Sequence, residues 1–571
     1  MHNTNLWLAL IAGILTLPSF AFAENAEVYS LSQEDIDQFN VSSIQELLNR
    51  VPGISASDSY VKIRGSSAVK VLVDGKPINN PLSSHSAIRW GFAPFSAIEQ
   101  IDIYRGASAA MFGEGTDGGA IVIHRKKGTN SHGSILFEGG NYGSLKVAGG
   151  NNVSINFHNL HGSFEEYQAN GFRENGDSLR FSSSISDQIS VCDDNSVSLS
   201  LDYSWEEKGS PGYPDYPRLY ARDASEAFTS SVYFKREHSI KSNLFFRSFW
   251  TKSVDPEREL RNEMESWSMG NSTDFRIPFP GKASIPVGVS FESSHVKGTD
   301  LSPKHENEAA IFGNWMMRLT VPHPLYLSIN GRFNWYSAFE DVLDPSTRLS
   351  FNPEKWKLFV SVGKGHVAPS ILKRYQNTST RIANPDLGME RTDKFEFGLS
   401  HGFSEALNLQ TSLYSKQTSE RITYVRIDDG MAQYRNIGEA SWLGVETTLS
   451  GALSKTLRYS ATHSWMKARD DSNDLVLSAS PEHRIQTELE WLPVGAMSVT
   501  LSCNNYSTQF SRSDNTERVP SYFVVNLKIE YQWKNSRCYL RVENLLDHDY
   551  LYGDGLPGSP TEFTIGLKRS F

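Results

Sequence analysis

Apolar and polar residues alternate with a period of two over much of the chain after residue 130. Clear examples are residues 197–206, 325–335, 485–491 and 523–533. This period predicts β-strands with one apolar and one hydrated face, as in a soluble sandwich or a membrane barrel. Two features favour the barrel. The runs reach about ten residues, enough to cross a bilayer at a tilt, and their apolar faces often end in Trp, Tyr or Phe, as at membrane interfaces.

Residues 29–127 show a different pattern, in which helical and strand signals are mixed. Ser43 and Glu46 form a capping box, which predicts a helix over residues 44–50. Alternation over residues 69–75 ends in Asp-Gly, a strong hairpin signal. Further short strands are predicted over residues 98–104 and 120–123. The pattern therefore indicates a small α/β domain ahead of the barrel.

We place the α/β domain at residues 24–128 and the barrel at residues 129–571. About 440 residues follow this boundary, and a strand with its turn takes about 20, so the barrel should have about 22 strands. A barrel of that size has a lumen wide enough to need a plug. The predicted fold is an all-β transmembrane barrel of antiparallel strands, with the N-terminal domain as a plug inside the lumen.

The start of the chain is typical of a secretory signal. An apolar run over residues 6–17 is followed by Ala21 and Ala23, the spacing that signal peptidase recognises. We expect a signal peptide at residues 1–23. The alternative is an uncleaved membrane anchor.

Composition narrows the class of protein. The 571 residues are 39% hydrophobic, 12% aromatic and 21% charged, with a net charge of −10. One apolar stretch cannot supply the spans of a helical membrane bundle, the aromatic content excludes a disordered chain, and the acidic balance argues against nucleic acid as a partner. Cys192, Cys503 and Cys538 give neither a disulfide framework nor a metal-ligand spacing. Because most outer-membrane enzymes lack a plug domain, we expect neither enzymatic activity nor a cofactor.

Short motifs occur in a fixed order along the chain. In the N-terminal domain they are IQELLNRVPGI (44–54), IRG (63–65), VLVDGKPI (71–78), IEQIDIYRG (98–106) and GGAIVI (118–123). In the barrel they are AP (368–369), NPDL (384–387), FEFG (395–398), YRNIG (434–438), GVE (444–446) and VENLLD (542–547). Together with a final strand that ends on Phe571, they resemble the TonB-dependent outer-membrane receptors over nearly the whole expected mature chain.

The resemblance implies a location in the bacterial outer membrane as a multi-pass barrel, surrounded by lipid and monomeric. It also implies import of a metal chelate, either a ferric siderophore or cobalamin, bound on the extracellular side. The periplasmic domain of TonB would supply the energy by moving the plug. Ahead of the first expected element of the plug, residues 32–39, the candidate contact for TonB is the segment around Val28 and Tyr29. If this segment is not a TonB box, the protein is a ligand-binding receptor that is not coupled to TonB.

Two arginines of the plug need partners, because a buried guanidinium without a carboxylate costs several kcal/mol. Arg64 and Arg105 each precede a glycine in apolar surroundings, and the resemblance places Glu396 and Glu446 on the facing barrel strands. We expect these four residues to form a lock cluster between plug and barrel. The alternative is that they are ordinary charges of the lumen.

The apical loops of the plug are the expected ligand contacts. A cation beside aromatic rings suits an anionic, aromatic chelate such as a catecholate or hydroxamate siderophore, whereas a serine-rich surface would equally suit cobalamin. Haem is less favoured because no histidine lies between Pro369 and Asn384. The alternative for Trp90 and Phe92 is that they only pack the loop. The candidate contacts are Ser57, Asp58, Tyr60, Ser83, His85, Arg89, Trp90 and Phe92.

Overall fold

The computed structural model describes residues 28–571, except residues 34, 37–40, 42, 84–86, 127–132, 193, 238, 280–282, 320–324, 379, 429–430 and 554. The expected signal peptide, the expected domain boundary and His85 lie outside the described residues. Among the residues that are described, no helix is long and apolar enough to cross a membrane.

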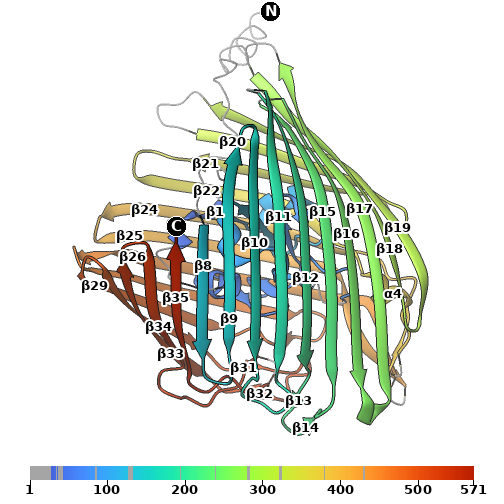
Figure 1. The fold of residues 1–571 in the computed structure, drawn as a ribbon. Helices are drawn as coiled ribbons and strands as arrows, with labels where there is room; N and C mark the ends of the chain where they lie inside the picture. The colour runs from blue at the N-terminus through green and yellow to red at the C-terminus, as the bar shows by residue number, and fades with distance from the viewer. Residues whose placement is uncertain are drawn as a thin grey trace, which may run out of the picture.

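The larger part of the chain is a closed barrel of 22 antiparallel strands, as the alternating pattern predicts (Figure 1). The last strand closes the barrel on the first, with Ile565 opposite Gly139. The strands are β8 (Gly133–Gly140), β9 (Leu145–Ile155), β10 (His158–Ala169), β11 (Ser178–Cys192), β12 (Asn195–Gly209), β15 (Arg222–Arg236), β16 (Ile240–Asp255), β17 (Leu260–Phe279), β18 (Ala283–Gly298), β19 (Leu301–Leu319), β20 (Leu325–Tyr336), β21 (Val342–Phe351), β22 (Trp356–Val367), β24 (Glu390–Ser404), β25 (Leu407–Asp428), β26 (Met431–Ser454), β27 (Leu457–Asp470), β29 (His483–Val494), β30 (Met497–Tyr506), β33 (Tyr522–Trp533), β34 (Ser536–Glu543) and β35 (Glu562–Ser570).

Side chains on each barrel strand alternate between the outside and the lumen. On β24, Lys394 and Glu396 are buried in the lumen, whereas Phe395 between them is exposed on the outside. Large apolar residues are exposed in the same way around the barrel, for example Leu413 and Leu443. An apolar exterior around a polar interior is the arrangement that lipid requires of a transmembrane barrel.

The two ends of the barrel differ. At one end, the short-turn end, consecutive strands are joined by two to five residues. At the other, the long-loop end, six connections are longer than five residues, and the longest covers residues 368–389 between β22 and β24. Most of the small elements in the connections lie at the long-loop end: β13 (Gly212–Tyr213), β14 (Tyr216–Pro217), η4 (Pro256–Arg258), α4 (Ile371–Tyr375), β23 (Arg381–Ile382), β28 (Leu475–Val476), β31 (Gln509–Phe510) and β32 (Arg518–Val519).

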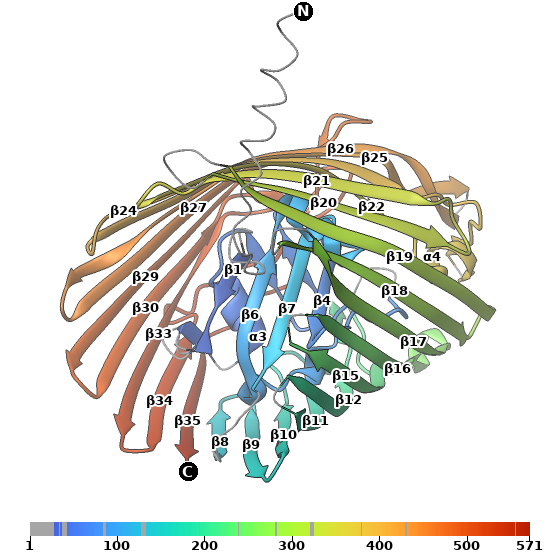
Figure 2. The same cartoon turned by 90° about the horizontal axis from the view of Figure 1, so that it is seen from above.

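The N-terminal domain lies inside the barrel as a plug (Figure 2). Its five-stranded sheet has the order β1-β6-β7-β4-β5, with β4 parallel to β7 and the other pairs antiparallel. The elements are β1 (Val28–Leu31), α3 (Ile44–Asn49), β2 (Ile54–Ala56), β3 (Val61–Ile63), β4 (Val69–Val73), β5 (Lys76–Pro77), η1 (Trp90–Phe92), η2 (Phe95–Ala97), β6 (Ile98–Tyr104), η3 (Gly106–Phe112) and β7 (Gly119–Arg125).

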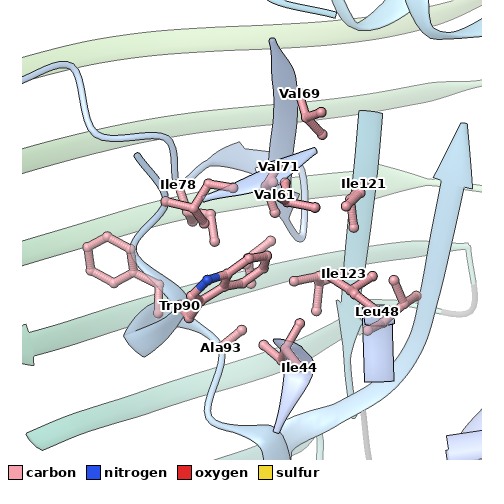
Figure 3. Close-up of a cluster of buried hydrophobic side chains, with 14 of the residues drawn as sticks. Ile44, Leu48, Val61, Val69, Val71, Ile78, Trp90, Ala93, Ile121 and Ile123 are labelled. Atoms are coloured by element: carbon pink, nitrogen blue, oxygen red, sulfur yellow. The ribbon is translucent and has the colours of Figure 1, made fainter. Parts of the chain in front are cut away.

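Local sequence signals account for the plug elements. The Ser43 hydroxyl caps α3 by accepting a hydrogen bond from the Glu46 amide at 3.1 Å. Asp74 and Gly75 both adopt positive φ, which suits the tight turn between β4 and β5. The apolar faces of the sheet and of α3 meet in one core, which includes Ile123 and is shown in Figure 3.

Candidate functional site

A cavity of about 980 Å³ lies between the plug and the barrel wall at the long-loop end. We call it the long-loop cavity. Its plug side is formed by α3, by the loop around residues 55–60 and by the segment around residues 88–95. The wall is formed by strands β8–β12 and by strands between β25 and β34.

Five of the predicted ligand contacts line this cavity: Ser57, Asp58, Tyr60, Arg89 and Trp90. Asp58 lies 3.6 Å from Arg180 Nη1 on β11, and Arg89 Nη1 lies 3.2 Å from Glu206 on β12. Ser83 is not among the lining residues. Its hydroxyl accepts a hydrogen bond from the Ala87 amide at 3.2 Å.

Trp90 and Phe92 differ from the expectation for ligand contacts. Phe92 is 1% exposed, does not line the cavity and packs edge-on against Phe249 of β16, with ring centroids 5.9 Å apart. Trp90 is 7% exposed, and its indole N–H donates to the Ser57 carbonyl oxygen at 3.0 Å. Both rings belong to the core of the plug, in which Figure 3 shows Trp90. Phe92 as a ligand contact is therefore wrong, because η1 turns this ring towards apolar neighbours.

A row of stacked tyrosines on the wall of the cavity was not predicted. Tyr506, Tyr522 and Tyr550 stack in sequence, with centroids 4.8 and 4.9 Å apart and interplanar angles of 22° and 18°. Tyr552 meets Tyr550 edge-on at 5.8 Å. All four line the long-loop cavity. Tyr550 and Tyr552 lie just after the VENLLD motif, and this signal could have indicated an aromatic loop.

The lining is close to electrically balanced, with nine Lys and Arg residues against seven Asp and Glu residues among the described ones. Most of the cations already contact carboxylates of the lining or the adjacent wall. The short contacts are Arg50 with Glu488, Arg64 with Glu446, Arg89 with Glu206, Lys146 with Glu165, Arg180 with Asp58, and Arg541 with Glu46.

The four residues of the expected lock cluster come together between the plug and strands β24 and β26. Arg64 Nη2 lies 2.7 Å from Glu396 Oε1 and 3.0 Å from Glu446 Oε2, and Arg105 Nη1 lies 3.1 Å from Glu446 Oε2. The Arg64 guanidinium also lies over the ring of Tyr414, 4.1 Å from its centroid. Burial would lower the pKa of Arg64, but Glu396 and Glu446 outweigh it and raise the pKa well above its ordinary value.

A second ionic contact joins the plug to β24 and β25. Asp117 accepts a hydrogen bond from Lys416 Nζ at 2.7 Å, and Lys394 Nζ donates to the Thr116 carbonyl oxygen at 2.8 Å. Burial alone would raise the pKa of Asp117, but Lys416 and Lys394 outweigh burial and hold the pKa well below its usual range.

This depressed pKa predicts acid sensitivity of the plug. A carboxyl with a lower pKa in the folded state stabilises that state above its unfolded pKa, about 3.9 for Asp, and loses the contribution as pH falls towards the folded pKa. We expect Asp117→Asn to destabilise the plug at pH 7 and the difference from the native protein to shrink as pH falls below about 4. Thermal unfolding, followed by fluorescence over this pH range, measures the difference in stability between the variant and the native protein. A difference independent of pH would contradict the prediction.

A third ionic contact lies on the opposite side of the plug and was also not predicted. Lys76 of β5 contacts Asp202 of β12, and Arg125 of β7 contacts both Asp202 and Asp74. Lys76 and Asp202 are each 1% exposed. Burial, the largest influence, lowers the pKa of Lys76 in spite of Asp202 beside it.

Val28 and Tyr29, the candidate TonB contacts, form part of β1 at the edge of the plug sheet. Val28 pairs with Tyr104 and Tyr29 with Ile103 of β6. The Tyr29 ring lies 5.4 Å from the guanidinium of Arg105, the residue that follows β6. In this structure β1 therefore connects directly to the lock cluster.

Comparison with known proteins agrees with the barrel and its plug. A family model described as TonB dependent receptor-like, beta-barrel matches residues 126–545, and one described as TonB-dependent Receptor Plug Domain matches residues 23–120. The chain belongs to the TonB-dependent receptor family. Members are outer-membrane transporters and receptors, in which long loops face the outside and short turns the periplasm. The long-loop cavity of this receptor therefore faces the outside.

Relatives of this receptor include the vitamin B12 transporter BtuB of Vibrio cholerae, 22% identical over 96% of this chain and 92% of the relative. BtuB of Photobacterium profundum is 20% identical over 92% and 89%. Among solved structures, the siderophore receptor PirA of Acinetobacter baumannii superposes with a TM-score of 0.80 at 16% identity, covering 98% of this chain and 99% of that one. At this identity the structural likeness indicates the fold alone.

Proposed function

We propose that this receptor imports a metal chelate, a ferric siderophore or cobalamin, by plug movement that TonB energises. The observation that carries the proposal is the long-loop cavity. It faces the outside, its volume of about 980 Å³ is at the upper end of the range for ligand pockets, and one side of it is the plug itself. A ligand bound there can reach the periplasm only if the plug moves.

The chemistry of the lining favours cobalamin between the two ligand classes. A ferric catecholate carries several negative charges and needs cations that are not already neutralised. Here most cations of the cavity contact carboxylates, for example Arg89 with Glu206. Stacked rings such as those of Tyr506 and Tyr522 suit a large, weakly charged ligand with polar amide groups and apolar faces.

The position of β1 supports coupling to TonB. A pull on the chain ahead of Val28 would load the pairing of β1 with β6, and β6 is followed by Arg105 of the lock cluster. Separating β1 from β6 would take the Tyr29 ring away from the guanidinium of Arg105. This is a route from a periplasmic pull to the contacts that hold the plug.

Uptake measurements test this function. Cells that express the receptor are expected to accumulate radiolabelled cyanocobalamin, and a protonophore is expected to reduce accumulation to the level of cells without the receptor. Binding at the cell surface should persist with the protonophore, because the cavity needs no energy to fill. Surface binding without accumulation would favour the alternative, a receptor that is not coupled to TonB. Ferric enterobactin serves as the competing ligand class in the same assay.

A further inference from the structure

A second cavity, of about 510 Å³, lies between the plug and the wall at the short-turn end. We call it the short-turn cavity. Its wall comes from strands β10–β22, and its plug side includes Lys70, Tyr104 and His124. No described residue of β24–β34 lines it. The plug thus separates a cavity open towards the outside from one on the periplasmic side.

The linings of the two cavities share three strands of the barrel wall, β10, β11 and β12. On β11, Ser182 lines the long-loop cavity and Ser186 lines the short-turn cavity. On β12, Ser204 lines the long-loop cavity and Ser200 lines the short-turn cavity. Four residues of a strand span about 13 Å, so the two cavities approach each other closely along this part of the wall.

A single row of wall residues separates the cavities there. Ser184 lies between the two serines of β11, and Asp202 between those of β12. The register makes the row continuous, because Ser163 of β10 pairs with Ser184, Ser184 with Asp202, and Asp202 with Thr229 of β15. All four residues are buried. We call them the wall row.

Two cations of the plug cover the wall row. Lys76 contacts Asp202 and donates to the Ser200 hydroxyl at 2.8 Å, while Arg125 contacts Ser184 and Asp202. Ser184 and Thr229 complete the set by donating to Asp202 at 2.7 and 2.9 Å. The Asp202 carboxylate is thus the acceptor on which both plug cations converge.

On β11 and β12, the wall on either side of the row is composed of short hydroxyl side chains, whereas on β10 the row is flanked by His161 and Glu165. Ser182, Ser186, Ser200 and Ser204 all project into a cavity. Small side chains leave the most room between plug and wall, and hydroxyls can exchange hydrogen bonds with a polar ligand without holding it by charge. At the row itself, the Ser163 hydroxyl is buried with no hydrogen-bond partner among the described residues.

We propose that the ligand passes from the long-loop cavity to the short-turn cavity along β10, β11 and β12, and that Lys76 and Arg125 on the wall row close this passage. The proposal rests on the import function above and adds its route and its gate. Displacing the segments around Lys76 and Arg125 opens the route, while the plug stays attached to β24–β26 through the lock cluster.

Conductance of the purified receptor in planar lipid bilayers tests the gate without ligand or TonB. The double variant K76A/R125A removes both cations from the wall row, and we expect a steady ionic current that the native receptor lacks. The matched control K394A/K416A removes two buried cations at the opposite wall, where the short-turn cavity does not extend. We expect it to remain closed. A closed K76A/R125A, or an equally conducting K394A/K416A, would overturn the proposal.

Thiol block locates the current. In a background carrying C192S, C503S and C538S, S184C is added to K76A/R125A, and a bulky anionic thiol reagent is expected to abolish most of the current. S412C is the matched control, because Ser412 is also buried and contacts a plug arginine, Arg64, at 3.0 Å. The reagent should leave its current unchanged. Equal block of both variants, or of neither, contradicts the route. Failure of uptake in cells would overturn the proposed import function but not the gate, because the ionic currents are measured without ligand transport.

Discussion

Replacing Glu446 by glutamine is expected to loosen the plug by about 3–5 kcal/mol, the usual cost of breaking a buried ion pair from one side. Glu446 accepts from both Arg64 and Arg105, and its side chain is 4% exposed. The neutral amide would remove the carboxylate that Arg64 and Arg105 share, while Glu396 remains beside Arg64. Hydrogen exchange of plug amides in the detergent-solubilised receptor measures the effect, since exchange through local opening reports the free energy of that opening.

The control for this variant is Glu340→Gln. Glu340 also pairs with an arginine, Arg391, but the pair lies at an exposed position. Exposed pairs contribute about 0–1 kcal/mol, so exchange of the plug amides should hardly change. If Glu446→Gln exchanged no faster than this control, the lock cluster would not hold the plug.

Tyr522→Ala is expected to weaken ligand binding about 10–100-fold, as loss of a central aromatic contact does at other binding sites. Tyr522 is the middle ring of the stack and contacts both Tyr506 and Tyr550. Its removal takes away one stacking surface and leaves the two neighbours free to turn. Isothermal titration of the purified receptor with cyanocobalamin measures the change, and ferric enterobactin is titrated in parallel.

Tyr531→Ala is the matched control for this prediction. Tyr531 lies on the same strand, β33, but is exposed and does not line the cavity. Its removal should leave the dissociation constant unchanged. Equal affinity of Tyr522→Ala and Tyr531→Ala would show that the ligand does not contact the tyrosine stack.

The fold could be predicted because the features that specify it are local. The alternation of apolar and polar residues within a strand indicates which of its side chains face lipid. Every strand of the barrel must meet this requirement by itself. The same holds for the helix after Ser43 and the turn at Asp74-Gly75, where one or two residues determine the backbone. The helix ends one residue earlier than predicted, at Asn49.

The site could be predicted only where a motif marked it. Arg64 and Arg105 lie in recognisable motifs of the plug, and their carboxylates lie in motifs of the barrel. Asp202 carries no such signal, because its contact with Lys76 depends on how the plug is rotated inside the barrel. The tyrosine stack likewise joins β30, β33 and the last long loop, which meet only through strand register.

Phe92 shows the opposite problem, since a loop residue with an aromatic ring suggested a ligand contact. An aromatic ring in a loop inside a barrel can pack against a bound ligand or against the neighbouring apolar core. Here the ring of Phe249 projects into the lumen and takes that contact. The sequence around Phe92 contains no information about β16.

The pairing of β1 with β6 has a mechanical consequence. Among the described residues, four pairs join these strands, from Val28 with Tyr104 to Leu31 with Ile101. A load on the chain ahead of Val28 reaches that first pair before the others, so the ladder would part from the side nearest Arg105. Such a short ladder separates at a modest force. The parallel pairing of β4 with β7, which lies deeper in the sheet, then bears no load.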